Sequence, residues 1–206
     1  MKKLTLFLLF LMAGISVTAA SLQLQQRSFS EKMIRMHIVA NSDTREDQQL
    51  KLQVRDAVLN VVQGAESKTE LSRCLPQVAS AAQACLREHG SDDRVCVTLK
   101  KERFPTRIYD VFSLPAGVYT ALRVTIGDGA GHNWWCVAFP SICLQAASDW
   151  EETARTAGFS SSEIDLITED GTAYVLKFKA LEWLEDLKVH LANNKTDENW
   201  ETDFRD

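Results

Sequence analysis

The sequence predicts a single α+β domain, in which a mixed, mostly antiparallel sheet packs against two to four helices. The first half of the 206 residues contains two segments with helical spacing of apolar residues, and the second half is rich in short strands joined by Gly- and Pro-containing turns. No internal repeat or interdomain linker stands out. A hydrophobic content of 45% is enough for one domain with its own core. We therefore expect one domain over residues 30–192.

The N-terminus has the features of a secretory signal peptide. Lys2 and Lys3 precede an apolar run over residues 4–17, and Val17-Thr18-Ala19 matches the small-x-small pattern before a signal peptidase site. We expect residues 1–19 to be the signal peptide. An uncleaved membrane anchor is the alternative, because the 17 residues from 4 to 20 lie at the lower end of the spanning range. Both interpretations export the rest of the chain.

The first elements follow from their hydrophobic periods. Residues 32–40 alternate, with Ile34, Met36 and Ile38 on one face, which predicts a strand. The next segment predicts an amphipathic helix that is capped within residues 41–43 and ends near Gly64. We expect Lys51 to lie on its solvated face.

A second helix is predicted to run to Gly90. Ser67 and Glu70 match a capping box at its start. Pro76 either kinks this helix or begins it, because proline is tolerated only in a first turn.

The remainder of the chain is read mainly as strands. The turns at residues 114–117 and 127–131 suit antiparallel hairpins. We expect strands at residues 95–99, 108–112, 118–126, 134–139 and 174–178, helices at 149–157 and 181–191, and an acidic, disordered tail at 193–206.

Composition excludes several function classes. A net charge of -5 and a pI near 5.4 argue against nucleic acid as a partner. The four histidines are scattered without a pair at i, i+4 spacing, so no metal site is predicted. No phosphate-binding loop, dinucleotide-binding glycine pattern or nucleophile elbow indicates a cofactor or a catalytic serine.

The segment GHNWWCVAFPSIC at residues 131–143 combines two adjacent tryptophans, a Phe-Pro step and two cysteines within thirteen residues. If it is a strand, Trp134 and Trp135 point to opposite faces, so one enters the core and the other is free to contact a partner. A turn around Pro140 brings Cys136 and Cys143 within bridging distance. Closing this loop by a disulfide would stabilise the fold by roughly 2–3 kcal/mol.

Three further cysteines leave their pairing open. Cys74 and Cys85 are too far apart to pair within one continuous helix. Cys85 with Cys96 is the more plausible geometry, since one ends a helix and the other lies in the following strand.

Two other polar groups are candidates for partner binding. Arg107 and Tyr109 either belong to an exposed polar face or make cross-strand charge pairs, of which the second is favoured. His37, Asn41 and Asp43 lie at a strand-to-helix turn, where the N–H groups of the helix could receive an anion. The alternative, which is favoured, is that Ser42 or Asp43 caps the helix and that His37 is a hydrogen-bonded strand histidine.

A thiol enzyme would combine Cys136 with His132 as base and Asn133 as orienting group. On one strand the histidine and the cysteine lie about 13 Å apart, which is too far for proton transfer. We therefore do not expect a thiol enzyme built on this pair.

The segments RMHIVANSDTREDQQLKLQVRDAVL (35–59) and FPTRIYDVFSLPAGVYTALRVTIGDGAGHNWWCVAFPSIC (104–143), after a signal peptide, resemble the stage II sporulation protein R family of endospore-forming Firmicutes. The sequence departs from the family pattern at Ser141, where a second proline is usual, and in its acidic C-terminal extension. The resemblance implies a protein that is not an enzyme but a secreted signal, made in the forespore and exported into the space between the forespore and mother-cell membranes. There it would trigger a membrane-embedded aspartic protease of the mother cell, which matures the precursor of sigma E.

The competing class is a secreted hydrolase of the cell wall or envelope that uses Cys136 or His37. A bridged Cys136 would exclude the thiol version. A purely structural envelope protein is the third possibility.

Overall fold

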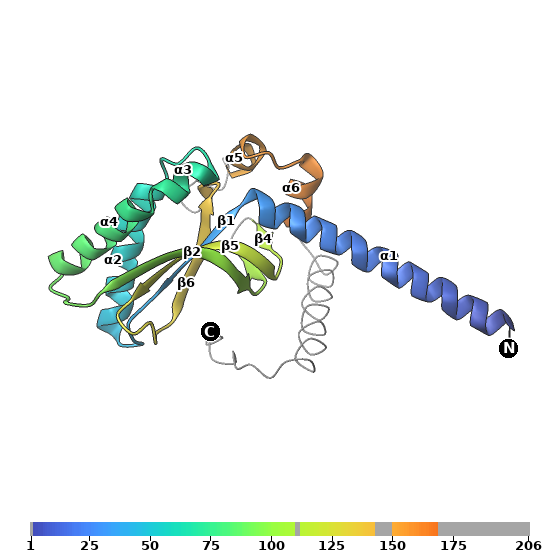
Figure 1. Cartoon of the computed structure of the whole chain (residues 1–206), viewed down its shortest axis with the longest axis horizontal. Helices are drawn as coiled ribbons and strands as arrows, with labels where there is room; N and C mark the ends of the chain where they lie inside the picture. The colour runs from blue at the N-terminus through green and yellow to red at the C-terminus, as the bar shows by residue number, and fades with distance from the viewer. Residues whose placement is uncertain (1, 110–111, 143–149, 169–206) are drawn as a thin grey trace.

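A four-stranded sheet occupies the middle of the computed structural model, which describes residues 2–109, 112–142 and 150–168 (Figure 1). Its strand order is β2-β5-β1-β6. The strands are β1 (Ile34–Val39), β2 (Val95–Phe104), β5 (Gly117–Ile126) and β6 (Asn133–Phe139). Strand β1 pairs in parallel with β5, whereas the other two pairings, β1 with β6 and β2 with β5, are antiparallel. The predicted α+β fold with a mixed, mostly antiparallel sheet in one domain is confirmed.

The connection at residues 127–131 is not the hairpin turn that the sequence predicted, because β1 lies between β5 and β6. The connection crosses the end of β1, where Ala130 and Gly131 donate backbone hydrogen bonds to the carbonyls of Asn41 and Ala40, both at 3.0 Å. A side chain at Gly131 would collide with the backbone carbonyl of Ser42, so this close approach requires glycine.

The predicted strand at residues 108–112 is also wrong. In its place are two short strands, β3 (Arg107–Ile108) and β4 (Ser113–Leu114), which pair with each other in a separate two-stranded sheet. Five alternating residues were too few to distinguish a sheet strand from a local hairpin.

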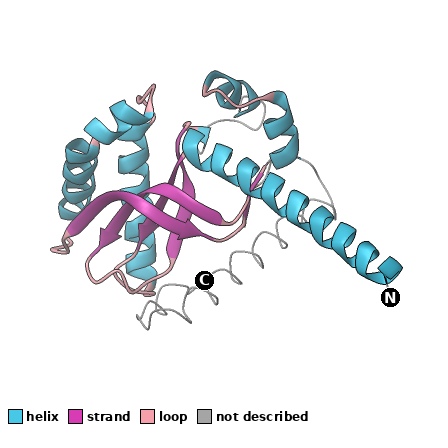
Figure 2. Cartoon of the chain, turned by 45° about the vertical axis from the view of Figure 1, so that its right-hand side comes forward, coloured by secondary structure: helices cyan, strands magenta, loops and turns pink. Residues whose placement is uncertain are grey.

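Helices α2 (Arg45–Val62) and α4 (Leu75–Glu88) pack side by side on one face of the sheet, which we call the helix face (Figures 1 and 2). The short helix α3 (Lys68–Arg73) precedes α4, and Pro76 lies in the first turn of α4, so the proline begins a helix and does not kink one. The apolar stripes of α2 and α4 meet the sheet in a core that includes Ile34, Met36, Ile38, Val54, Val58, Val78, Ala82, Leu122 and Val124.

The helix caps were predicted with unequal success. The hydroxyl of Ser67 accepts a hydrogen bond from the N–H of Glu70, which confirms this cap. The cap of α2 is Thr44, which lies just beyond the predicted range 41–43. The side chain of Asp43 instead reaches across to His132.

A second core covers part of the opposite face, which we call the second face. The end of α1 (Lys2–Lys32), α5 (Trp150–Thr156) and α6 (Ser161–Thr168) lie on this side of the molecule (Figure 2). The helix predicted at residues 149–157 is confirmed as α5, whereas α6 was not predicted. The buried residues of this core include Met33, Phe104, Leu114, Tyr119, Ala121, Val137, Trp150 and Ile164.

Helix α1 extends from the body of the molecule (Figure 1). Large apolar side chains along its N-terminal half are exposed, among them Leu4, Leu6, Phe7, Leu9 and Phe10. Within the described ranges, no helix combines the length and apolar character needed to cross a membrane. The signal peptide at residues 1–19 and its cleavage stay predictions. The strand expected at 174–178, the helix at 181–191 and the tail at 193–206 lie outside the described residues.

Candidate functional site

The central strand β1 carries two polar side chains into the second face. Arg35 is 0% exposed and His37 is 3% exposed. They alternate with the apolar residues that face α2 and α4, as the period of a strand requires. A half-solvated strand would leave these polar positions in water, but all six residues of β1 are buried.

His37 is held by contacts on both ring nitrogens. Its Nε2 lies 2.7 Å from Oε2 of Glu102 on β2, and its Nδ1 lies 3.2 Å from Oδ1 of Asn133 on β6. Because β5 and β1 lie between β2 and β6, these contacts connect the two outer strands of the described sheet.

Glu102 is the carboxylate of this group. Burial opposes its ionisation, but the hydrogen bond from His37 and the charges of His37, Arg123 and Lys100 outweigh burial and hold the pKa below its ordinary value. Arg123 lies 3.9 Å and Lys100 lies 3.4 Å from its two oxygens. The carboxylate therefore stays charged at neutral pH.

Trp135 forms the apolar part of the same site. Its indole is stacked on the imidazole of His37 and is met edge-on by Phe104, with ring centroids 4.9 Å and 5.1 Å away. The guanidinium of Arg107 lies 4.8 Å above the indole. The side chain of Trp135 is thus half-buried between a histidine and an arginine.

Arg35 is surrounded by aromatic rings. Its guanidinium lies 4.3 Å from the ring centre of Phe104 and 5.1 Å from that of Tyr119. Its Nη2 donates a hydrogen bond to the hydroxyl of Tyr109 at 3.2 Å. Its Nε and Nη1 are buried and have no hydrogen-bond partner among the described residues.

We call this group the second-face cluster: Arg35, His37, Glu102, Arg107, Tyr109 and Trp135. It unites four of the residues that the sequence suggested for partner binding, namely His37, Arg107, Tyr109 and Trp135. Trp134 lies on the helix face, packed against that core, with Arg55 5.2 Å above its ring. The opposite orientation of the two tryptophans is confirmed, but the expectation of one core and one outward ring is wrong, because both are half-buried.

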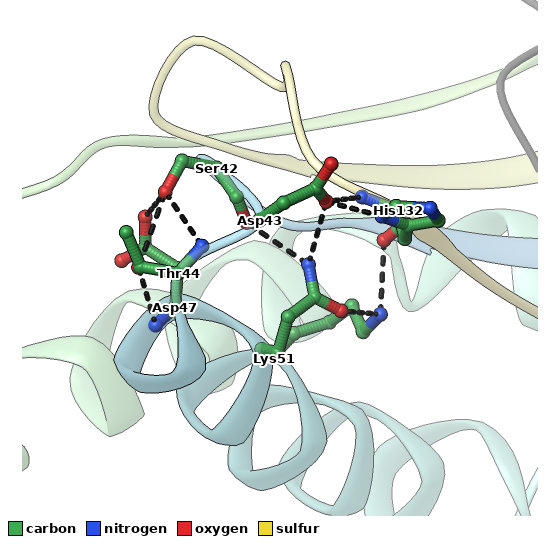
Figure 3. A network of polar contacts seen from close by, with 7 residues as sticks. Ser42, Asp43, Thr44, Asp47, Lys51 and His132 are labelled. Carbon is green, nitrogen blue, oxygen red and sulfur yellow. Dashed lines mark hydrogen bonds and ion pairs between the residues drawn. The ribbon is translucent and has the colours of Figure 1, made fainter.

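The remaining two candidates, Asn41 and Asp43, lie at the turn between β1 and α2, where Figure 3 shows the contacts of Asp43. Asp43 accepts a hydrogen bond from the backbone N–H of His132 at 2.7 Å and pairs with Nδ1 of the same residue. These bonds hold the pKa of Asp43 below its ordinary value. Asn41 donates to Asp47 at 3.1 Å and accepts from the N–H of Asp128 at 3.0 Å.

The predicted cluster of His37, Asn41 and Asp43 is therefore divided, because His37 makes its contacts on the second face. The N-terminus of α2 is capped by Thr44 and carries Glu46 and Asp47 in its first turn, which does not favour an anion there.

Lys51 corrects another expectation, since it is 5% exposed and not solvated. Its ammonium donates to Gln48 at 2.6 Å and to the carbonyl of His132 at 2.9 Å (Figure 3). Burial lowers its pKa, because the charged form loses water.

Of the five cysteines, Cys74, Cys85 and Cys96 are free thiols, so a bridge between Cys85 and Cys96 is not formed. Cys136 is 5% exposed within the core of the helix face. Cys143 lies outside the described residues, and the Cys136–Cys143 disulfide stays a prediction.

Sequence reasoning missed Arg35 and Glu102, whose partners are distant along the chain. It also missed Ile108, the neighbour of Arg107 and Tyr109, which is 74% exposed. The one available signal was a pair of polar residues, Arg35 and His37, at alternate positions of an apolar strand.

Comparison with known proteins identifies relatives. The profile of the family described as stage II sporulation protein R matches residues 30–149. The chain is 30% identical to stage II sporulation protein R of Bacillus subtilis (strain 168), over 88% of this chain and 96% of that protein. No solved structure matches the chain.

Proposed function

Because this chain belongs to the stage II sporulation protein R family, we propose that it is an exported signal of endospore formation. In this proposal the chain leaves the forespore, enters the space between the forespore and mother-cell membranes, and there activates the membrane-embedded aspartic protease of the mother cell. The protease then processes the precursor of sigma E. The observation that carries the proposal is the similarity to the Bacillus subtilis protein over nearly the full length of both chains.

The N-terminal helix supports the export step. Its exposed apolar residues follow Lys2 and Lys3, the charge arrangement of a secretory signal. Among the described side chains, these exposed ones belong to neither of the two cores. An apolar surface of this kind suits recognition by the export machinery.

The second-face cluster supports the contact step. It brings together three partly exposed side chains, the indole of Trp135, the phenol of Tyr109 and the guanidinium of Arg107, which are the types that carry most of the binding energy at protein interfaces. Ile108 provides an exposed apolar residue beside them. We propose this face as the contact surface for the extracytoplasmic part of the protease.

A secreted hydrolase receives less support from the geometry. Cys136 is buried in the core of the helix face, and the imidazole of His132 is engaged by Asp43. His37 is bonded at both nitrogens and is 3% exposed. A nucleophile and a base need access to substrate and to each other. Cys136 and His37 lack access to substrate because they are buried, and the exposed imidazole of His132 is paired with Asp43.

The export step is tested in sporulating cells that lack their own copy of the gene and produce this chain instead. Replacing Leu9 and Phe10 by Asp interrupts the apolar run and is expected to retain the protein in the forespore and abolish processing of pro-sigma E. The measurement is an immunoblot of pro-sigma E and its product, together with fractionation of the chain.

Leu24→Asp is the matched control, because Leu24 is also exposed on α1 but lies beyond the predicted signal peptide. This variant should be exported and should support processing. Normal processing with a chain that stays in the forespore would contradict the proposal.

A further inference from the structure

We infer that the second face binds a carboxylate through Arg35, and that an acidic segment of the protein partner supplies it. The inference starts from a buried charge that has no counter-ion among the described residues. Arg35 is 0% exposed, and its one described polar partner is the neutral hydroxyl of Tyr109. Within the described ranges no carboxylate forms an ion pair with it, and its Nε and Nη1 have no acceptor.

Such an arrangement is costly in an isolated protein. A buried guanidinium loses its hydration, and buried donors without acceptors cost free energy as well. The rings of Phe104 and Tyr119 offset part of the cost through cation–π contacts. A buried water would satisfy a donor but would leave the charge uncompensated. An anion would both accept hydrogen bonds from the free donors of Arg35 and compensate its charge.

The surroundings favour an anionic occupant. Arg107, Arg123 and Lys100 lie on the same face as Arg35, and Glu102 forms ion pairs with Lys100 and Arg123. Four cationic side chains, Arg35, Arg107, Arg123 and Lys100, thus gather on one face of a chain whose net charge is -5. The charge complementarity points to an acidic partner segment.

The geometry of the guanidinium also indicates how the carboxylate approaches. A guanidinium can donate two parallel hydrogen bonds to a carboxylate through Nε and Nη2 or through Nη1 and Nη2. Both pairs include Nη2, the atom that is bonded to Tyr109. A bidentate carboxylate must replace or share that hydroxyl. Tyr109 is half-buried, so the hydroxyl bonded to the buried Arg35 belongs to a partly exposed side chain. The exposed side chain of Ile108 suits an apolar residue next to the acidic one.

The test uses the purified full chain and two capped peptides, Leu-Glu-Leu-Gly and its uncharged counterpart Leu-Gln-Leu-Gly. The readout is the Nε–H resonance of Arg35 in a nitrogen-15 correlation spectrum, identified by its loss in Arg35→Met. The Glu peptide is expected to shift this resonance and to bind at least about tenfold more tightly than the Gln peptide, since a charge-assisted bond is lost. Equal binding of the two peptides, or no binding of either, overturns the inference.

Variants separate a binding role from a structural one. Arg35→Met should abolish the preference for the Glu peptide, whereas Arg55→Met, which removes the cation above Trp134 on the helix face, should keep it. Tyr109→Phe removes the competing hydroxyl but keeps the ring, so it should bind the Glu peptide at least as tightly as wild type. If Arg35→Met fails to fold, the affinities of wild type and Tyr109→Phe for the Glu and Gln peptides still test the inference. Loss of the preference in Arg55→Met, or its retention in Arg35→Met, contradicts the inference.

Sodium acetate distinguishes the source of the carboxylate. A peptide carboxylate should bind more tightly than acetate, because Ile108 contacts its apolar neighbours. Binding of acetate as tight as that of the Glu peptide overturns the assignment to a protein partner. The inference rests on the proposed function for the identity of that partner. Peptide binding is measured without the protease and without export. A failure of the peptide experiment, which tests the inference, is therefore distinguishable from a failure of the export experiment, which tests the proposed function.

Discussion

The imidazole of His37 lies parallel to the indole of Trp135, with ring centroids 4.9 Å apart and 6° between the ring planes. The two residues are direct neighbours in the antiparallel register of β1 and β6. The stack places one aromatic residue of the Trp134-Trp135 pair beside the polar contacts of His37. The stability of the sheet and the shape of the second-face cluster therefore depend on the same side chain.

Substitution of the two tryptophans by alanine should destabilise the fold by similar amounts. Each indole is half-buried, so each loss should be about 2 kcal/mol, below the 3–5 kcal/mol typical of a fully buried ring. Urea denaturation measures both. Only Trp135→Ala should alter the second-face cluster, seen as shifted side-chain resonances of His37. A loss near zero at either position contradicts the packing described for it.

Glu102→Gln should destabilise the chain in a pH-dependent manner. The pKa of Glu102 is lower in the folded chain than its ordinary value of 4.5, so its ionised form stabilises the fold above that pH, and the contribution is lost as the pH falls through the folded pKa. At pH 7 the free energy of unfolding should fall by roughly 1–3 kcal/mol. The gap from wild type should narrow below about pH 4.5. A gap that is constant between pH 7 and pH 3 would refute the role of the ionised carboxylate.

Ionised Glu163 is expected to stabilise the attachment of α1 to the body of the molecule, again in a pH-dependent manner. Burial opposes its ionisation, but hydrogen bonds from Lys32, Ser28 and Ser160 outweigh it and lower the pKa to about 2. Its contribution is complete above the ordinary value of 4.5 and is lost as the pH falls toward about 2. Glu163→Gln should therefore increase hydrogen exchange at the end of α1 at pH 7 but not at pH 2.

Glu151→Gln is the matched control, because Glu151 is exposed and its ion pair with Arg155 is 4.0 Å long. This substitution should leave hydrogen exchange at the end of α1 unchanged at every pH. An equal effect of the two substitutions would show that Glu163 does not hold the helix.

The disulfide predicted between Cys136 and Cys143 should appear in thiol counting. Denatured but unreduced protein should react with iodoacetamide at Cys74, Cys85 and Cys96 only, the cysteines that are free in the structure. Replacing both members of the pair by Ser should lower the free energy of unfolding by roughly 2–3 kcal/mol. Alkylation at Cys136 or Cys143 without reduction would show that the bridge is absent.

The sequence predicted those elements whose cause is local. The helical period of α2 and the capping serine of α3 are visible within a few residues, and both were found as expected. The order of the strands was not visible. Nothing in the loop at residues 127–131 shows that β1 separates β5 from β6, because that depends on pairing with a distant segment.

The same limit applies to the site. The aromatic and basic residues of β3 and β6 are conspicuous in the sequence, and four candidates do meet in one cluster. Arg35 and Glu102 were missed because their burial results from contacts among β1, β2 and the β3–β4 hairpin, which no single segment contains. The exposure of Lys51 was predicted wrongly, because the loop between β5 and β6 covers the side of α2 that the hydrophobic period alone assigns to solvent.

The most direct test of the proposed contact surface is the processing of pro-sigma E in sporulating cells that produce Ile108→Asp. Ile108 is 74% exposed, so the substitution should not affect folding or export, yet it places a negative charge beside the basic second face. Leu52→Asp on α2, at a residue that is 37% exposed on the other side of the sheet, is the control. We expect processing to be lost with Ile108→Asp and kept with Leu52→Asp, with both chains exported and melting at the wild-type temperature. Normal processing with exported Ile108→Asp would contradict the assignment of the signalling surface to this face.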